Sequence, residues 1–92
     1  MRVEWSDPAV SDLEAISKHI EHDRNLTTAN RVVRAIYDAA RSLRTMPNRG
    51  RYGRLENTHE LPVQGLPYLV VYRVFKERVA ILRIVHGAQK WP

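Results

Sequence analysis

The sequence has no cysteine and no long run of apolar residues. Without cysteine the chain forms neither a disulfide nor a thiolate metal site, as expected of a protein in a reducing cytoplasm. No stretch approaches the roughly 18 apolar residues of a membrane-spanning helix. The N-terminal residues also lack the apolar core of a secretory signal. We therefore expect a cytoplasmic protein that does not cross a membrane.

Acidic residues are missing from a long basic segment, residues 39–55. This segment carries Arg41, Arg44, Arg49, Arg51 and Arg54. Residues 1–38 hold five basic and seven acidic residues, whereas residues 39–92 hold ten basic and three acidic ones. Twelve of the fifteen basic residues are arginine, which binds phosphate and carboxylate through paired hydrogen bonds. The pattern predicts a polyanionic partner, either a nucleic acid or an acidic protein.

The first helix is predicted to begin close to Ser6 or Asp7, either of which provides an N-cap oxygen. Pro8 follows where the first turn of a helix accepts proline. Apolar residues then recur at intervals of three and four, which indicates an amphipathic helix that ends near residues 23–25. These apolar residues are Ala9, Leu13, Ile16 and Ile20.

A second amphipathic helix is predicted after a short break. Thr27 or Thr28 is the expected N-cap, and Pro47 stops the helix. Its apolar stripe consists of Ala29, Val32, Val33, Ile36, Ala40 and Leu43. The following residues, 47–54, combine proline, glycine and arginine, and predict a basic loop.

The second half of the chain predicts strands. Residues 58–63, 68–75 and 79–86 are separated by short connections, which favours an antiparallel meander. Residues 2–5 predict a further strand at an edge of the sheet. The expected order is β-α-α-β-β-β in one α+β domain, residues 1–92. Two antiparallel helices pack on one face of a small, mainly antiparallel sheet. A chain this short buries only about 60–65% of its unfolded surface, so a stabilising partner is expected.

The last two strands each contain an arginine, and the length of their connection decides how the two arginines are placed. Arg73 shares a face with Leu69 and Val71. A three-residue connection would put Arg83 on that same face. A two-residue connection would put Arg83 on the other face and bring His86 onto the Arg73 face. Both registers place cations on the side that the helices do not cover.

The chain shows no pattern typical of a metal or cofactor site. It has no glycine-rich phosphate loop, no Ser/His/Asp triad, and no ligand spacing of histidines with carboxylates. The four histidines are His19, His22, His59 and His86. We expect neither a metal nor a cofactor. Arginine, histidine and tyrosine are nevertheless sufficient for a metal-free ribonuclease, because cations stabilise the phosphorane charge and histidine transfers protons.

Structural roles are the alternative for the same residues. Arg73 could form an ion pair with Glu60 or Glu77, and His86 could hydrogen-bond the backbone at the end of its strand. Trp91 is better explained as a residue that fills the core or an interface than as a base-stacking ring.

Several stretches are similar to those of one known family. They are Trp5-Ser6 at the end of the first strand, Asp12-Leu-Glu-Ala-Ile16, Gly50-Arg-Tyr-Gly-Arg54, Tyr72-Arg-Val74 and Ile81-Leu-Arg-Ile-Val-His-Gly87. Together they make the whole chain resemble the RelE/ParE superfamily, the toxins of bacterial type II toxin–antitoxin modules. The resemblance implies a growth-inhibiting toxin that a small antitoxin neutralises in a hetero-oligomer. The target is either DNA gyrase, as for ParE-like members, or mRNA on the ribosome, as for RelE-like nucleases.

One position favours the ParE-like branch. In RelE-like nucleases an arginine contacts the scissile phosphate at the position that Leu69 occupies here, and leucine cannot stabilise phosphate charge. Under the nuclease alternative, Arg73, Arg83 and His86 would be catalytic. A simple nucleic-acid-binding module is the remaining alternative. The residues expected to bind the target are Arg49, Arg51, Arg54, Arg73, Arg83, His86, Lys90 and Trp91.

Overall fold

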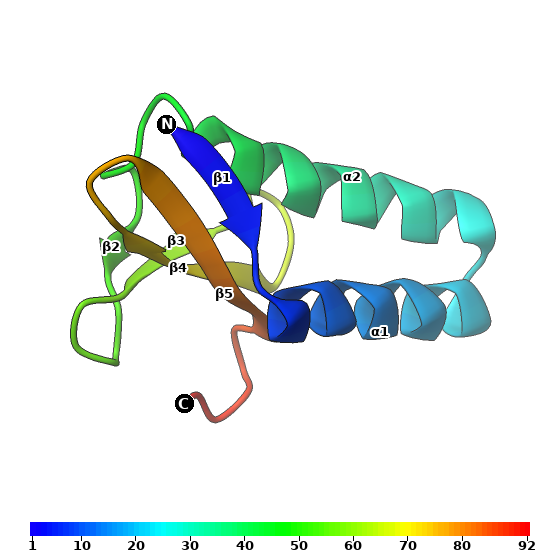
Figure 1. Cartoon of the computed structure of the whole chain (residues 1–92). Helices are drawn as coiled ribbons and strands as arrows, with labels where there is room; N and C mark the ends of the chain where they lie inside the picture. The colour runs from blue at the N-terminus through cyan, green and yellow to red at the C-terminus, as the bar shows by residue number, and fades with distance from the viewer.

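The computed structural model describes residues 1–92 and contains two helices and one five-stranded sheet (Figure 1). The elements are β1 (Arg2–Trp5), α1 (Asp7–Asp23), α2 (Leu26–Ser42), β2 (Arg51–Tyr52), β3 (His59–Pro62), β4 (Tyr68–Val74) and β5 (Arg78–His86). The strand order is β1-β5-β4-β3-β2; β1 runs parallel to β5, and the other neighbours are antiparallel. The predicted fold class is confirmed, including the first strand at an edge.

The two helices start at specific caps. The Ser6 hydroxyl accepts a hydrogen bond from the backbone N–H of Ala9 at 3.2 Å and caps α1, as predicted. The predicted cap of α2 was wrong. Asn25 fills this role, because its side chain accepts the backbone N–H of Thr28 at 2.7 Å. Asparagine is at least as good an N-cap as threonine, and α2 therefore begins immediately after the break.

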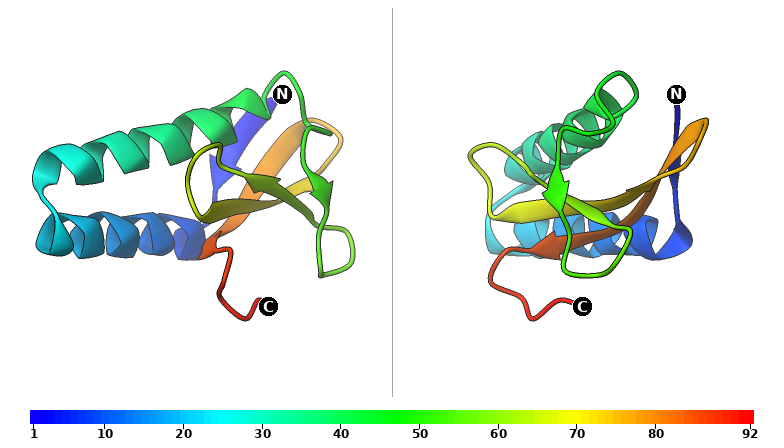
Figure 2. Two further views of the ribbon diagram at one scale, coloured as in Figure 1. Left: turned by 180° about the vertical axis from the view of Figure 1, so that it is seen from behind. Right: turned by 90° about the vertical axis from the view of Figure 1, so that its left-hand side faces the viewer.

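The main core lies between the helices and one face of the sheet. The stripe of α2 is buried, with Ile36, Ala40 and Leu43 fully inaccessible. Tyr72 and Ile81 meet it from β4 and β5. The helix hairpin extends beyond the sheet at the end where α1 joins α2 (Figures 1 and 2). Neither helix is long and apolar enough to cross a membrane.

A β-bulge sets the register of the last hairpin. The N–H of Phe75 donates to the carbonyl of Arg78 at 2.8 Å, so the connection has two residues. Tyr72 pairs with Ile81, but the preceding residue, Val71, pairs with Arg83. Leu82 is therefore the extra residue of the bulge. The bulge returns Arg83 to the face of Arg73 despite the two-residue connection, a combination that neither predicted register contained.

The predicted basic loop contains a short strand. Arg51 and Tyr52 form β2 and pair with Glu60 and His59 of β3. Two residues are too few to show a period of two, and the sequence pattern therefore predicted only a loop.

Candidate functional site

The face of the sheet that the helices leave open carries a small apolar cluster. Leu69, Val71 and Val85 are buried there, and Leu82 and Trp91 pack against them. The C-terminal segment after β5 thus folds back onto this face (Figure 2). Leu69 is only 6% exposed. The position of the nuclease arginine is therefore apolar and closed to solvent.

Arg83 lies on the open face but its guanidinium is already paired. Its Nε and Nη2 atoms donate to the two carboxylate oxygens of Asp12 on α1, at 2.7 and 2.9 Å. These hydrogen bonds raise the pKa of Arg83 above its usual value, although burial opposes the effect. The guanidinium also lies 5.6 Å from the ring centre of Trp91. Arg83 is therefore neutralised within the chain and holds the C-terminal segment.

Arg73 is exposed and has no acidic partner. Its guanidinium lies 4.8 Å from the ring centre of Phe75, a contact that leaves the charge in solvent. The alternative of an ion pair with Glu60 or Glu77 was wrong. Glu60 instead faces two arginines of the basic segment.

His86 lies on the other face of the sheet. It pairs with Tyr68, whose side chain packs on the helix side, and the two rings meet edge-on at 5.7 Å. Its Nδ1 accepts the backbone N–H of Ala88 at 3.1 Å. Burial raises the pKa of the Tyr68 hydroxyl. His86 therefore does not share a face with Arg73 and Arg83, because the bulge reverses the facing of the residues that follow Leu82.

A buried carboxylate organises the basic segment. Glu60 is 1% exposed, and its two oxygens lie 3.7 Å from Arg51 and from Arg54. It also accepts the backbone N–H of Arg54 at 3.1 Å. Arg54 in turn donates to the carbonyl of Trp91 at 3.2 Å. Glu60 thus connects the basic segment to the C-terminal segment, where Lys90 is exposed.

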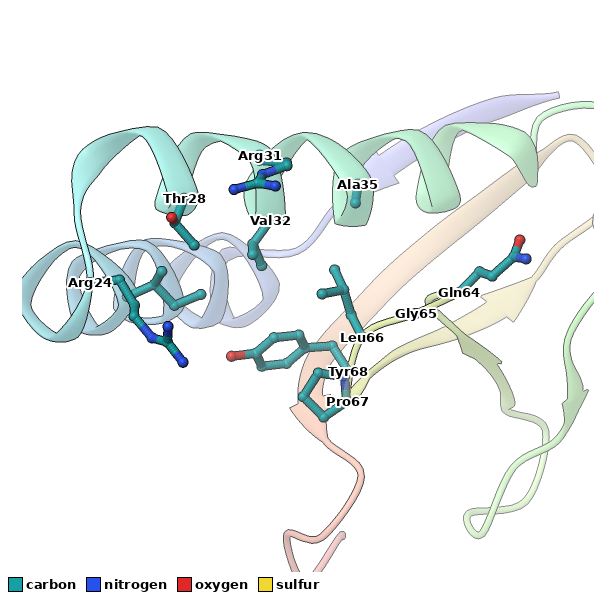
Figure 3. Close-up of a pocket in the computed structure, with 11 residues that line it drawn as sticks. Arg24, Thr28, Arg31, Val32, Ala35, Gln64, Gly65, Leu66, Pro67 and Tyr68 are labelled. Atoms are coloured by element: carbon teal, nitrogen blue, oxygen red, sulfur yellow. The ribbon is translucent and has the colours of Figure 1, made fainter.

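The largest pocket lies between the helices and the β3–β4 connection and has a volume of about 490 Å³ (Figure 3). Val32 and Tyr68 give it an apolar floor, and Arg24 and Arg31 stand at its rim. Ile20 also lines the pocket. No acidic residue lines it. The sequence interpretation missed this site. No local signal could have found it, because Arg24 is the C-cap of α1 and Arg31 belongs to α2, and only the packing of the two helices brings them to one pocket.

The comparisons with known proteins agree with one another. Residues 3–91 match the profile of the family described as the ParE toxin of the type II toxin–antitoxin system parDE. A Sinorhizobium fredii protein named Y4kP, described as a candidate toxin, is 37% identical over 91 residues. This match covers 99% of the present chain and 93% of that protein. A solved structure titled as the chromosomal ParDE TA system of P. aeruginosa superposes with a TM-score of 0.86 at 25% identity. That superposition covers 94% of this chain and 95% of the other.

Proposed function

Because this chain belongs to the ParE toxin family of type II toxin–antitoxin systems, we propose that it inhibits DNA gyrase in the cytoplasm. A cognate antitoxin protein neutralises it in a hetero-oligomeric complex. Of the residues expected to contact the target, Arg49, Arg51, Arg54, Arg73, His86 and Lys90 are exposed. Arg83 and Trp91 are half-buried and contact each other within the chain.

The observation that supports gyrase over mRNA is the dispersal of the groups that a nuclease needs. Cleavage by an RNA 2′-hydroxyl requires cations fixed on the phosphate before the transition state, and one such contact is typically worth about 10²–10³-fold in rate. Here Leu69 is buried, Arg83 is neutralised by Asp12, and His86 pairs with Tyr68 on the opposite face. Arg73 is the nuclease candidate whose charge has no acidic partner, and His86 does not lie on its face.

The pocket between the helices and the β3–β4 connection is the proposed antitoxin site. Its apolar floor fits the apolar side of an amphipathic segment. Arg24 and Arg31 would pair with acidic residues of that segment, since the pocket has no acidic residue of its own. A segment that covers this pocket also covers part of a small core, and it stabilises the chain by mass action.

Two assays on the purified chain test the choice of target. We expect inhibition of supercoiling by DNA gyrase, with inhibition relieved by the antitoxin encoded beside the toxin gene. We expect no discrete cuts in the A site when primer extension is run on translating ribosomes. Discrete cuts that disappear in Arg83→Ala or His86→Ala, without any effect on supercoiling, would replace the gyrase proposal with the nuclease alternative.

A further inference from the structure

Three aromatic rings form a ladder that ends on an uncovered tyrosine. Tyr52, His59 and Tyr72 stand opposite one another on the adjacent strands β2, β3 and β4. The ring centres are 5.5 Å apart between Tyr52 and His59 and 5.3 Å apart between His59 and Tyr72. Tyr72 is fully buried, whereas Tyr52 is 90% exposed. The stack therefore runs from the core to solvent, and Tyr52 is its outermost ring.

The inner end of the ladder is fixed by the chain that leads into β2. The Tyr72 hydroxyl donates to the carbonyl of Pro47 at 2.9 Å and accepts the N–H of Gly50 at 2.8 Å. A Cβ atom on Gly50 would lie 2.7 Å from that hydroxyl, so the backbone passes directly against the ring. Because the segment from Pro47 to Tyr52 is held in this way, the exposed ring has a defined position.

The surroundings of Tyr52 are cationic and open. Tyr52 is 90% exposed and lines none of five surface pockets, so its ring offers an open face to solvent. Arg49 is exposed, and its guanidinium donates one hydrogen bond to the Ser42 hydroxyl. The Arg51 side chain is 60% exposed but points to the opposite face of β2, where it shares the carboxylate of Glu60 with another arginine. Arg49 is therefore the cation on the side of the ladder, where its charge acts on the Tyr72 hydroxyl.

We propose that Tyr52 is a stacking platform for an unpaired nucleobase, and that Arg49 binds an adjoining phosphate of a single-stranded nucleic acid. An exposed aromatic ring beside cations is the arrangement by which proteins bind single strands without reading their sequence. This contact goes beyond the proposed inhibition of gyrase, although Arg49 is among the residues expected to contact that target, and the binding test below contains no gyrase. β2 lies at the end of the molecule away from the α1–α2 connection (Figure 1), so the platform is also separate from the proposed antitoxin pocket.

The test measures binding of labelled homopolymers of about twelve nucleotides, a length within the range of single-strand sites. The probes are oligothymidylate, oligouridylate and an abasic deoxyribose-phosphate chain, titrated at low salt and followed by fluorescence anisotropy. The variants are Tyr52→Ala, Tyr52→Phe and Tyr37→Ala. Tyr37 is the matched control, because it is also exposed but stacks on Trp5, away from the ladder. Circular dichroism confirms that each variant is folded.

We expect Tyr52→Ala to weaken binding of the base-containing strands about tenfold, since one stacked base contributes roughly that much. Tyr52→Phe and Tyr37→Ala should bind the base-containing strands with the affinity of the original chain. The abasic strand should bind weakly, and with equal affinity, to the original chain and to every variant. Tyr52-dependent binding of either homopolymer supports the proposal, and comparing the two identifies the preferred sugar. Three results would overturn the proposal. In the first, Tyr52→Ala binds the base-containing strands as tightly as the original chain does. In the second, it loses as much affinity for the abasic chain as for those strands. In the third, the original chain binds neither homopolymer.

Discussion

Asp12 and Arg83 lie 71 positions apart in the sequence and meet in a two-pronged ion pair between α1 and β5. The same carboxylate accepts the backbone N–H of Ile84 at 2.9 Å. The paired part of β1 reaches only to Ile81 on this side of β5. Beyond the end of β1, Asp12 thus accepts a backbone hydrogen bond from the edge of β5, and it attaches α1 to that edge.

We expect Asp12→Asn to lower the free energy of unfolding by about 1–2 kcal/mol, because it removes charge-assisted hydrogen bonds in a partly exposed position. Urea unfolding at neutral pH measures the loss. Asp38→Asn is the control, since the Arg34–Asp38 pair is well exposed and spans one helical turn. Such a pair contributes about 0.3–0.5 kcal/mol. Equal losses in the two variants would argue against a special role for Asp12.

Tyr72→Phe should cost about 1–2 kcal/mol at neutral pH, because the Pro47 carbonyl and the Gly50 N–H lose their common partner. Tyr37→Phe, on the exposed side of α2, should cost almost nothing. Chemical unfolding of both variants beside the original chain makes the comparison. If the free energy of unfolding of Tyr72→Phe fell no more than that of Tyr37→Phe, the hydrogen bonds of the Tyr72 hydroxyl would not contribute to stability.

The same hydroxyl makes stability depend on alkaline pH. Burial raises the pKa of Tyr72 above its usual value of 10.0, although the Gly50 hydrogen bond and the Arg49 charge act in the opposite direction. Above pH 10 the unfolded tyrosine loses its proton before the folded one, so the unfolded state binds fewer protons and stability falls as pH rises. We expect the stability difference between the original chain and Tyr72→Phe to shrink between neutral pH and pH values above 10. A difference that stayed constant in urea unfolding across this range would contradict the expectation.

Gly50→Ala should destabilise the chain by about 1–3 kcal/mol, because the new methyl group has to displace a buried ring. Gly87→Ala is the matched control, since its Cβ would meet only the Pro67 carbonyl at 3.4 Å. Thermal unfolding of the two variants distinguishes them. A melting temperature of Gly50→Ala equal to that of Gly87→Ala would show that the ring moves without cost.

Charge reversal at the pocket tests the antitoxin site. Arg24→Glu combined with Arg31→Glu should weaken antitoxin binding by at least about tenfold, because both proposed ion pairs become repulsive. Arg34→Glu is the control, since Arg34 belongs to α2 but does not line the pocket. Isothermal titration with the antitoxin measures the affinities, and gyrase inhibition should be unchanged in the double variant. Unaltered antitoxin affinity would place the interface elsewhere.

The elements that sequence reasoning predicted well are those with a local signal. The stripe from Ala29 to Leu43 has the period of a helix, and Ser6 has the side chain that a cap requires. The resemblance of whole stretches to the RelE/ParE superfamily located the chain in its family, which the match over residues 3–91 confirms. Leu69 favoured the ParE-like branch because leucine cannot stabilise phosphate charge, and the match to the ParE family agrees with that choice.

The features that were missed depend on distant partners. No local pattern pairs Asp12 with Arg83, because only the packing of α1 along β5 brings them together. The facing of His86 depends on one extra residue in a bulge, and alternation along the strand does not reveal where that residue lies. The aromatic ladder requires the registers of three strands at once, one of which is only two residues long.

The bulge at Leu82 also bears on how related chains can differ in length. Deletion of this one residue would leave Tyr72 opposite Ile81 and Val71 opposite Arg83, because the ladder would simply become regular. A deletion between Ile84 and His86 would instead turn the rest of the strand to the wrong face. Over evolutionary time, β5 should therefore tolerate the loss of residue 82 better than a loss in its last three positions, and gaps among homologous strands should collect at the bulge.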